Sequence, residues 1–188
     1  MINYTPRLDK AMRIAAEAHS EQTRKGTSIP YIVHPFAVMY IAAQETDNED
    51  TLIACLFHDI LEDVPDKYSK EEMREDFGDR VVRIVEGVTK DDSIIDWKAR
   101  SEAYLRHLQI ADSQSVIVSG ADKIHNLQSI LIDYEQHGEQ LWTRFNADKH
   151  SQLWWYKSVT SVMRERLPNC ELTITLNDLC DRLDSIVK

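Results

Sequence analysis

The chain has 188 residues, of which 43% are hydrophobic and 29% charged, a composition typical of one soluble globular domain. Its formal net charge of −10 argues against nucleic acid or an anionic membrane as the main partner. The three cysteines lack a Cys-x-x-Cys spacing, and the sequence shows no targeting segment and no apolar run of membrane length. We therefore expect a cytoplasmic protein with no membrane partner.

Helical periodicity dominates the chain. Five glycines and five prolines are its main interruptions, and between them apolar residues recur with a period of about 3.6. We predict an all-α fold, a single helical domain over residues 1–188 with about eight to ten helices. The predicted helices cover 8–20, 35–44, 52–64, 69–78, 79–88, 94–108, 113–137, 147–166 and 171–187.

Local signals set several of these boundaries. Pro35 fits the first residue of its helix, Ser69 with Glu72 fits a capping box, and Asp79 can cap the next helix. Gly138 fits the end of the longest helix. The β-branched run at 81–88 also fits a strand, but its helical flanks favour a helix. A similar pattern at 172–176 leaves the start of the last helix open.

Four ionisable residues interrupt the apolar run 52–64. On one continuous helix His58, Asp59, Glu62 and Asp63 fall at about 0°, 100°, 40° and 140°, so they share one side. Three carboxylates on the side of a core helix need a positive charge between them, and a metal ion is the simplest one. The alternative is a surface helix whose polar face has this sequence by chance.

Two more candidate ligands come from distant segments. His34 lies at a predicted helix start, and Asp122 lies in an apolar helix with little polar cover. With His58 and Asp59 they form a set of two imidazoles and two carboxylates that suits a divalent transition metal, and the oxygens favour manganese or iron over zinc. Taken singly, His34 also fits a capping residue, and Asp122 fits an ion-pair partner of Lys123 or Arg83.

Asp122 begins a polar stripe on its helix. Asn126 and Ser129 lie at about +40° and −20° from it, so a carboxylate, an amide and a hydroxyl share one face. The alternative interpretation is an exposed polar face. The stripe favours a site in which the metal ligand and further polar contacts lie side by side.

Five motifs in order resemble the hydrolase domain of the RelA/SpoT homologues, which are HD-type metal-dependent phosphohydrolases. They are Arg-Lys at 24–25, Pro-Tyr-Ile-Val-His-Pro at 30–35, His-Asp-Ile-Leu-Glu-Asp at 58–63, Val-Glu-Gly-Val-Thr-Lys at 85–90 and Ala-Asp-Lys-Ile-His-Asn-Leu at 121–127. The resemblance spans about residues 8–131. Because the length leaves no room for a synthetase domain, the chain is similar to the single-domain small alarmone hydrolases.

This resemblance implies a manganese-dependent enzyme of the stringent response, with one divalent ion per chain. Its reaction would remove pyrophosphate from the 3′ position of guanosine tetra- or pentaphosphate (ppGpp or pppGpp). The matching positions are His34, His58, Asp59 and Asp122 as metal ligands, Glu62 and Asp63 at the attacking water, Arg24 and Lys25 in the nucleotide site, and Asn126 and Ser129 near ribose and base. Lys123 departs from the family, which often has arginine there, so the charge is kept but a bidentate fork is lost.

The residues suit this chemistry independently of the resemblance. A divalent ion brings the pKa of its bound water towards neutrality, and Glu62 or Asp63 can orient or deprotonate that water. Which of the two is acid and which is base stays open. An anionic substrate needs local cations, and Lys90 lies in a loop that can supply one. Lys149 and Tyr156 share a helix face and are expected substrate contacts, although an aromatic helix packed on the core is an alternative.

Two other functions stay open at this point. An HD phosphatase acting on another nucleotide, such as NADPH, an adenine alarmone or a nucleoside monophosphate, would use the same metal centre. A non-catalytic nucleotide-sensing domain would keep the fold, but a missing ligand would mark it, and none is missing here. Oligomeric state is not decided by the sequence.

Overall fold

The computed structural model describes residues 3–188 and confirms the all-α prediction. Within that range the chain forms ten α-helices and one 3-10 helix, and its only β-type pairing is an isolated bridge between Thr23 and Pro30. The elements are α1 (Pro6–Ala18), α2 (Val33–Ala42), α3 (Glu49–Phe57), α4 (Ile60–Asp63), α5 (Lys70–Phe77), α6 (Asp79–Glu86), α7 (Trp97–Ile110), α8 (Ser113–His137), η1 (Gly138–Arg144), α9 (Lys149–Arg166) and α10 (Glu171–Val187). Among these described helices, none is both long and apolar enough to cross a membrane.

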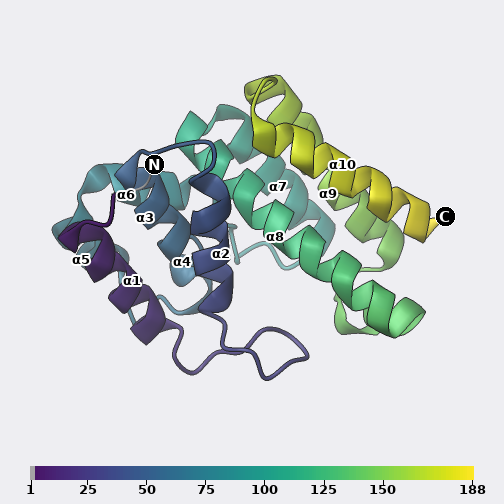
Figure 1. Cartoon of the computed structure of the whole chain (residues 1–188), viewed down its shortest axis with the longest axis horizontal. Coiled ribbons are helices and arrows are strands. Elements are labelled where there is room, and N and C mark those ends of the chain that lie inside the picture. Colours follow the sequence, from purple (N-terminus) through teal and green to yellow (C-terminus); the bar gives the residue numbers. More distant parts are fainter. Residues whose placement is uncertain (1–2) are drawn as a thin grey trace.

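Helix α8 is the element around which the others pack. It contacts α2 and α3 on one side and α9 and α10 on the other, and it crosses the middle of the molecule in Figure 1. Its first half is buried on all sides, with every residue from Ser115 to Ile124 inside the protein. A helix that is apolar all round belongs in a core. Asp122 is therefore placed in the core because of the residues around it.

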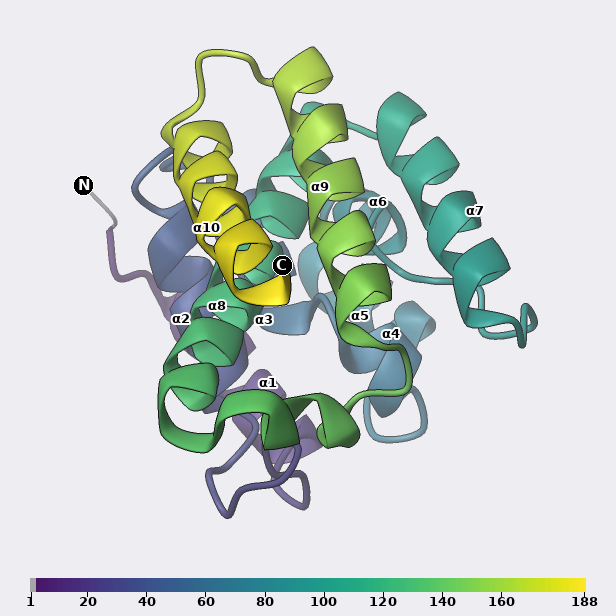
Figure 2. The ribbon, with the colours of Figure 1, turned by 90° about the vertical axis from the view of Figure 1, so that its right-hand side faces the viewer.

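The long loop between α1 and α2 lies next to η1. Both elements are at the lower edge of the molecule in Figure 1 and again in Figure 2, although more than 100 residues separate them in the chain. A Cβ atom added to Gly26 in this loop would lie 3.2 Å from Cδ of Arg144 in η1. The two segments together form one wall of the pocket described below.

Several boundaries follow the predicted capping signals. Ser69 and Glu72 form the predicted capping box, and α8 ends at His137, followed by Gly138, whose φ of 54° suits a residue without a side chain. The β-branched run of α6 and the ambiguous start of α10 are both helical. Tertiary packing outweighs β propensity there, because the valines and leucines of both segments are buried in the core.

The prediction of one continuous helix over 52–64 is wrong. Helix α3 ends at Phe57, His58 and Asp59 form a turn, and α4 begins at Ile60. Nδ1 of His58 lies 2.8 Å from the backbone oxygen of Cys55, which in a continuous helix would accept from the amide of Asp59. The imidazole thus takes over a helix hydrogen bond, and the interruption turns both side chains towards the site.

Other boundaries differ by a few residues. Helix α2 begins at Val33, so Pro35 is its third residue, which is tolerated because amides of the first turn have no partner inside the helix. Asp79 is the first residue of α6 and makes no side-chain cap. Helix α7 begins at Trp97, three residues later than predicted, because Asp96 caps it through the amide of Ala99.

Candidate metal centre and adjoining pocket

The four predicted metal ligands converge from three parts of the fold. His34 lies in the first turn of α2, His58 and Asp59 form the turn between α3 and α4, and Asp122 lies in α8. Nε2 of His34 is 3.2 Å from Nε2 of His58 and 3.2 Å from Oδ1 of Asp122. Nε2 of His58 is 2.9 Å from Oδ2 of Asp59. Residues that are 88 positions apart at the extremes thus share one site.

The spacing of these atoms fits one divalent ion. Ligand atoms about 2.1 Å from an ion, at tetrahedral or octahedral angles, lie roughly 3.0–3.5 Å from each other. The distances from the two histidine nitrogens to the two carboxylates lie between 2.9 and 3.8 Å. His34, His58 and Asp59 form a group whose ligand atoms all lie within 4.8 Å of one another and can hold a metal ion. Asp122 is not part of that group, but its Oδ1 lies 3.2 Å from Nε2 of His34 and 3.8 Å from Nε2 of His58.

Both imidazoles are held through their other ring nitrogen. The Cys55 carbonyl can only accept, so Nδ1 of His58 carries a proton, and in its neutral form the ring presents the lone pair of Nε2 to the site. Nδ1 of His34 lies 2.7 Å from Nδ1 of His125 in α8. Contacts of this kind orient metal-binding histidines in many proteins. The chemistry of this donor set therefore fits a bound cation.

The charged groups at the centre shift one another's pKa values. Burial disfavours the Asp122 carboxylate, but the Lys123 ammonium and the two histidines hold its pKa well below the usual range. Burial also disfavours ionised Asp59, and the nearby His58 and His34 likewise keep its pKa low. Burial would lower the pKa of His58, yet the charges of Asp59 and Asp122 raise it to about 9. A proton and a metal ion thus compete for the same atoms.

Glu62 and Asp63 follow on α4, and their surroundings differ. Oε1 of Glu62 accepts from the backbone amide of Lys90 at 2.6 Å, and its Oε2 lies 3.6 Å from Nζ of the same lysine. Asp63 makes no such contact among the described residues. Desolvation and the charges of Asp59 and Glu62 raise the pKa of Asp63 to about 6. Glu62 is therefore fixed in position, whereas Asp63 can exchange a proton near neutral pH.

A buried ion pair holds the candidate ligand Asp122 in place. Nζ of Lys123 donates to Oδ2 of Asp122, and both residues are only 6% exposed. The ammonium also lies 5.5 Å from the ring centres of Tyr104 and Trp155. Burial alone would lower the pKa of Lys123, but Asp122 raises it, so the lysine stays charged. This pair holds one oxygen of Asp122 and leaves Oδ1 facing the histidines.

A pocket of about 410 Å³ adjoins the metal centre, between the α1–α2 loop, α8, η1 and α9. Three of its residues contact the candidate ligands directly. The hydroxyl of Tyr31 donates to Oδ2 of Asp59 at 2.5 Å, and Nδ2 of Asn126 donates to Oδ1 of Asp122 at 2.5 Å. His125 is the third, through its contact with His34. A molecule in the pocket would therefore lie next to the ligands of the metal.

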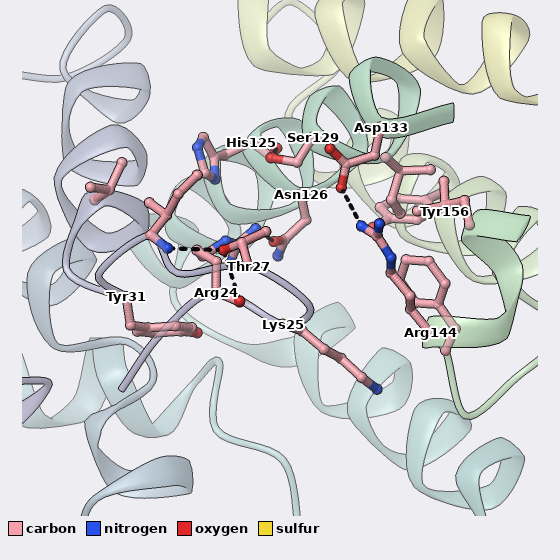
Figure 3. Close-up of a pocket in the computed structure, with 15 residues that line it drawn as sticks. Arg24, Lys25, Thr27, Tyr31, His125, Asn126, Ser129, Asp133, Arg144 and Tyr156 are labelled. Atoms are coloured by element: carbon pink, nitrogen blue, oxygen red, sulfur yellow. Dashed lines mark hydrogen bonds and ion pairs between the residues drawn. The ribbon is translucent and has the colours of Figure 1, made fainter. Parts of the chain in front are cut away.

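Five of the predicted substrate contacts line this pocket, namely Arg24, Lys25, Asn126, Ser129 and Tyr156. Nη2 of Arg24 donates to Oδ1 of Asn126 at 2.9 Å, and Figure 3 shows the two side chains meeting beneath α8. Burial raises the pKa of Tyr156, so its hydroxyl stays protonated. The pocket thus combines cations and hydrogen-bond donors with apolar walls.

The other two predicted contacts, Lys90 and Lys149, lie elsewhere. Lys149 pairs with Glu139 at 3.2 Å and does not line the pocket. Lys90 stands beside Glu62 and lines a separate cavity of about 130 Å³ together with Trp97 and Trp155. The helix spacing that grouped Lys149 with Tyr156 is correct, but the lysine side chain turns to an acidic partner.

The predicted contacts did not include Tyr31, His125, Asp133 or Arg144. Tyr31 and His125 lie inside the quoted motifs, so their sequence neighbours were the available signal. Asp133 continues the stripe of Asp122, Asn126 and Ser129 by one more turn, and this spacing could have revealed it. Arg144 lies in the connector before α9, where no pattern pointed to it.

Comparison with protein families gives a match to the HD domain model over residues 11–152. The chain is 36% identical over 137 residues to a guanosine-3′,5′-bis(diphosphate) 3′-pyrophosphohydrolase of Aquifex aeolicus, covering 71% of this chain and 19% of that protein. It is 35% identical over 130 residues to the bifunctional (p)ppGpp synthase/hydrolase SpoT of Escherichia coli, covering 66% and 18%. The chain thus spans under a fifth of the length of these curated relatives.

The fold also has a close counterpart among solved structures. A metazoan ortholog of SpoT, described as hydrolysing ppGpp, superposes with a TM-score of 0.80 at 24% identity, over 97% of this chain and 98% of that one. At this identity the likeness concerns the fold. The family match covers three quarters of the sequence and includes all four convergent ligands, so this chain belongs to the HD domain family.

Proposed function

We propose that this protein is a metal-dependent hydrolase that removes pyrophosphate from the 3′ position of guanosine tetra- or pentaphosphate. The observation that carries the proposal is the convergence of His34, His58, Asp59 and Asp122 beside a pocket lined with cations. Of the relatives named above, one is named for this activity and the other is named as a (p)ppGpp synthase/hydrolase, which supports the choice of substrate. The pocket is large enough for a nucleotide and reaches the metal ligands through Tyr31 and Asn126.

The four convergent residues would hold one divalent ion per chain, and their two carboxylates favour manganese. When bound, such an ion lowers the pKa of water and polarises a phosphoryl oxygen. Tyr31 and Asn126 would orient the carboxylates of Asp59 and Asp122 by donating to their ligand oxygens. His125 would do the same for His34 by accepting from its Nδ1.

Glu62 and Asp63 would have different roles in the reaction. Glu62 is fixed by the amide and ammonium of Lys90, so we assign it to orienting the attacking water. Asp63 has a pKa of about 6, which suits a group that takes up and releases a proton near neutral pH. Both residues lie on the short helix α4 directly after the two ligands His58 and Asp59.

The negative charges of the substrate would be met locally in spite of the acidic chain. Arg24 and Lys25 line the pocket from the α1–α2 loop, and Ser129 and Tyr156 add hydroxyl groups from α8 and α9. Lys90 lies beside Glu62, where its charge can bind the pyrophosphate that is released. Lys149 would reach a substrate only by leaving Glu139, and this exposed pair costs little to break.

Product analysis tests the proposal. Guanosine tetraphosphate is incubated with the protein and Mn²⁺, and pyrophosphate, orthophosphate and nucleotide products are quantified. We expect pyrophosphate and GDP, with turnover reduced about 10²–10⁴-fold in Glu62→Gln. Glu71→Gln on the exposed side of α5 is the control and should match the parent. Release of orthophosphate alone would point to a phosphatase acting on another nucleotide, such as NADPH or an adenine alarmone. Equal rates in the parent and in His58→Ala would contradict catalysis by this centre.

A further inference from the structure

Asp133 extends the polar stripe of α8 away from the metal centre. Relative to Asp122, the residues Asn126, Ser129 and Asp133 lie at about 40°, −20° and 20° around the helix, so all four share one face. Eleven residues of helix correspond to about 16 Å. Asn126, Ser129 and Asp133 all line the pocket. The stripe therefore leads from the metal centre to the far end of the pocket, where a second carboxylate stands.

Arg144 meets Asp133 at that far end. Its Nη1 lies 3.3 Å from Oδ2 of Asp133, and Figure 3 shows this pair at the opposite end of the pocket from Arg24 and His125. The arginine comes from η1 and packs against Gly26 of the α1–α2 loop. Leu141 and Phe145, on either side of Arg144 in the chain, add apolar walls next to it.

The pair is not required to hold the fold together. The two side chains retain 27% and 36% of their exposure, and ion pairs of that kind contribute little to stability. Both line the pocket that adjoins the metal centre. A hydrogen-bond acceptor and a hydrogen-bond donor placed together at the end of a pocket with apolar walls are suited to recognising the polar edge of an aromatic base.

We infer that Asp133 and Arg144 recognise the base of the bound nucleotide and select guanine. This inference rests on the proposed function, which places a phosphate group at the metal centre. With phosphate there and ribose along Asn126 and Ser129, the edge of the base that is remote from the sugar faces Asp133 and Arg144.

Guanine complements this pair chemically. Its remote edge carries the N1–H and 2-amino donors beside the O6 acceptor. The two oxygens of Asp133 accept from N1–H and the 2-amino group, and a guanidinium N–H of Arg144 donates to O6. Adenine would present its N1 lone pair to the carboxylate and its 6-amino group to the guanidinium, so like groups would face each other. Hypoxanthine keeps O6 and N1–H but lacks the 2-amino group.

Binding of three nucleoside diphosphates tests the inference without hydrolysis. Affinities for GDP, IDP and ADP are measured by calorimetry on the full chain, for the parent, Asp133→Asn and Arg144→Gln. For the parent we expect GDP to bind about tenfold tighter than IDP, and IDP about tenfold tighter than ADP. In Asp133→Asn the preference for GDP over IDP should fall below about threefold. In Arg144→Gln the affinities for GDP and IDP should fall together by about tenfold, while that for ADP stays unchanged.

Glu135→Gln is the matched control, because Glu135 lies in the same turn of α8 and pairs with Arg182 at 3.8 Å, outside the pocket. It should leave all three affinities within about twofold of the parent, and circular dichroism melts confirm that each variant is folded. Equal binding of the three nucleotides by the parent would overturn the inference. So would an equal loss for all three in Arg144→Gln, because that result identifies Arg144 as a phosphate contact.

The outcome is separable from that of the proposed reaction. Turnover of guanosine tetraphosphate together with equal binding of GDP and ADP would overturn base recognition by this pair and leave the hydrolase intact. A strong guanine preference that disappears in Asp133→Asn, without any hydrolysis in Mn²⁺, would support the pair and contradict the proposed reaction.

Discussion

Replacing Lys123 with methionine removes the cation that is paired with Asp122 and leaves a buried carboxylate without its main partner. Both residues are 6% exposed, and methionine fills most of the lysine volume against Tyr104 and Trp155. Removing one partner of a buried ion pair typically costs about 3–5 kcal/mol of stability. Asp122 keeps its contacts with His34 and Asn126, so we expect the lower end, about 3 kcal/mol.

The reverse change is expected to cost more. Asp122→Asn leaves the Lys123 ammonium buried against two aromatic rings, with Asp122 as the only ion-pair partner that it had in the described structure, so we expect about 5 kcal/mol. In the double variant neither charge remains. Its loss should therefore be smaller than the sum of the two single losses by at least about 2 kcal/mol.

Urea denaturation in EDTA, followed by circular dichroism, measures the three free energies of unfolding. The same lysine-to-methionine change at Lys157, whose partner Asp184 lies 2.6 Å away and whose side chain is 51% exposed, is the control and should cost at most about 1 kcal/mol. Additivity of the two single variants within about 0.5 kcal/mol would refute the claim that the buried pair acts as a unit.

Three further predictions concern the site and its support. Asp63→Asn should stabilise the metal-free protein at pH 7, since the folded pKa of about 6 exceeds the unfolded value and the charged form is therefore penalised. Because the side chain is exposed and solvent screens its charge, we expect a gain of only about 1 kcal/mol. That penalty is absent below about pH 4, so thermal melts at pH 3.5 should show no gain in stability. An equal gain at pH 7 and at pH 3.5 would contradict the raised pKa of Asp63. Gly87→Ala should cost about 1–3 kcal/mol in urea melts because an added Cβ would lie 2.7 Å from Cβ of Ser115, and an unchanged midpoint would rule out that clash. Mn²⁺ at 100 times its dissociation constant should add about 2.7 kcal/mol to the parent and nothing to Asp59→Asn, and a similar gain in both would argue for binding elsewhere.

The helices were largely predictable because burial imposes a period on apolar residues. The bounds of α8 agree with the sequence at both ends, where Asp112 caps the first turn and Gly138 ends the last. The convergence of the four ligands was also accessible, because buried charges at His34, His58 and Asp122 need a common partner. The need to pair buried charges indicated this convergence more clearly than any local sequence pattern did.

The features that were missed depend on contacts between distant residues. The interruption at His58 arises when its ring takes the Cys55 carbonyl, and the apolar run around it contains no glycine or proline that signals a break. Lys149 lies on the predicted helix face, but Glu139 captures its side chain. Arg144 reaches the pocket only because the chain reverses at Gly138, and no periodicity spans that reversal.

The claim on which the account depends is that four side chains from α2, the α3–α4 turn and α8 hold one divalent ion. Anomalous diffraction from crystals soaked in Mn²⁺ tests it most directly. We predict a single strong peak within about 2.3 Å of Nε2 of His34, Nε2 of His58 and carboxylate oxygens of Asp59 and Asp122. A fully soaked crystal with no peak at this position, or with manganese bound only at surface carboxylates, would contradict it.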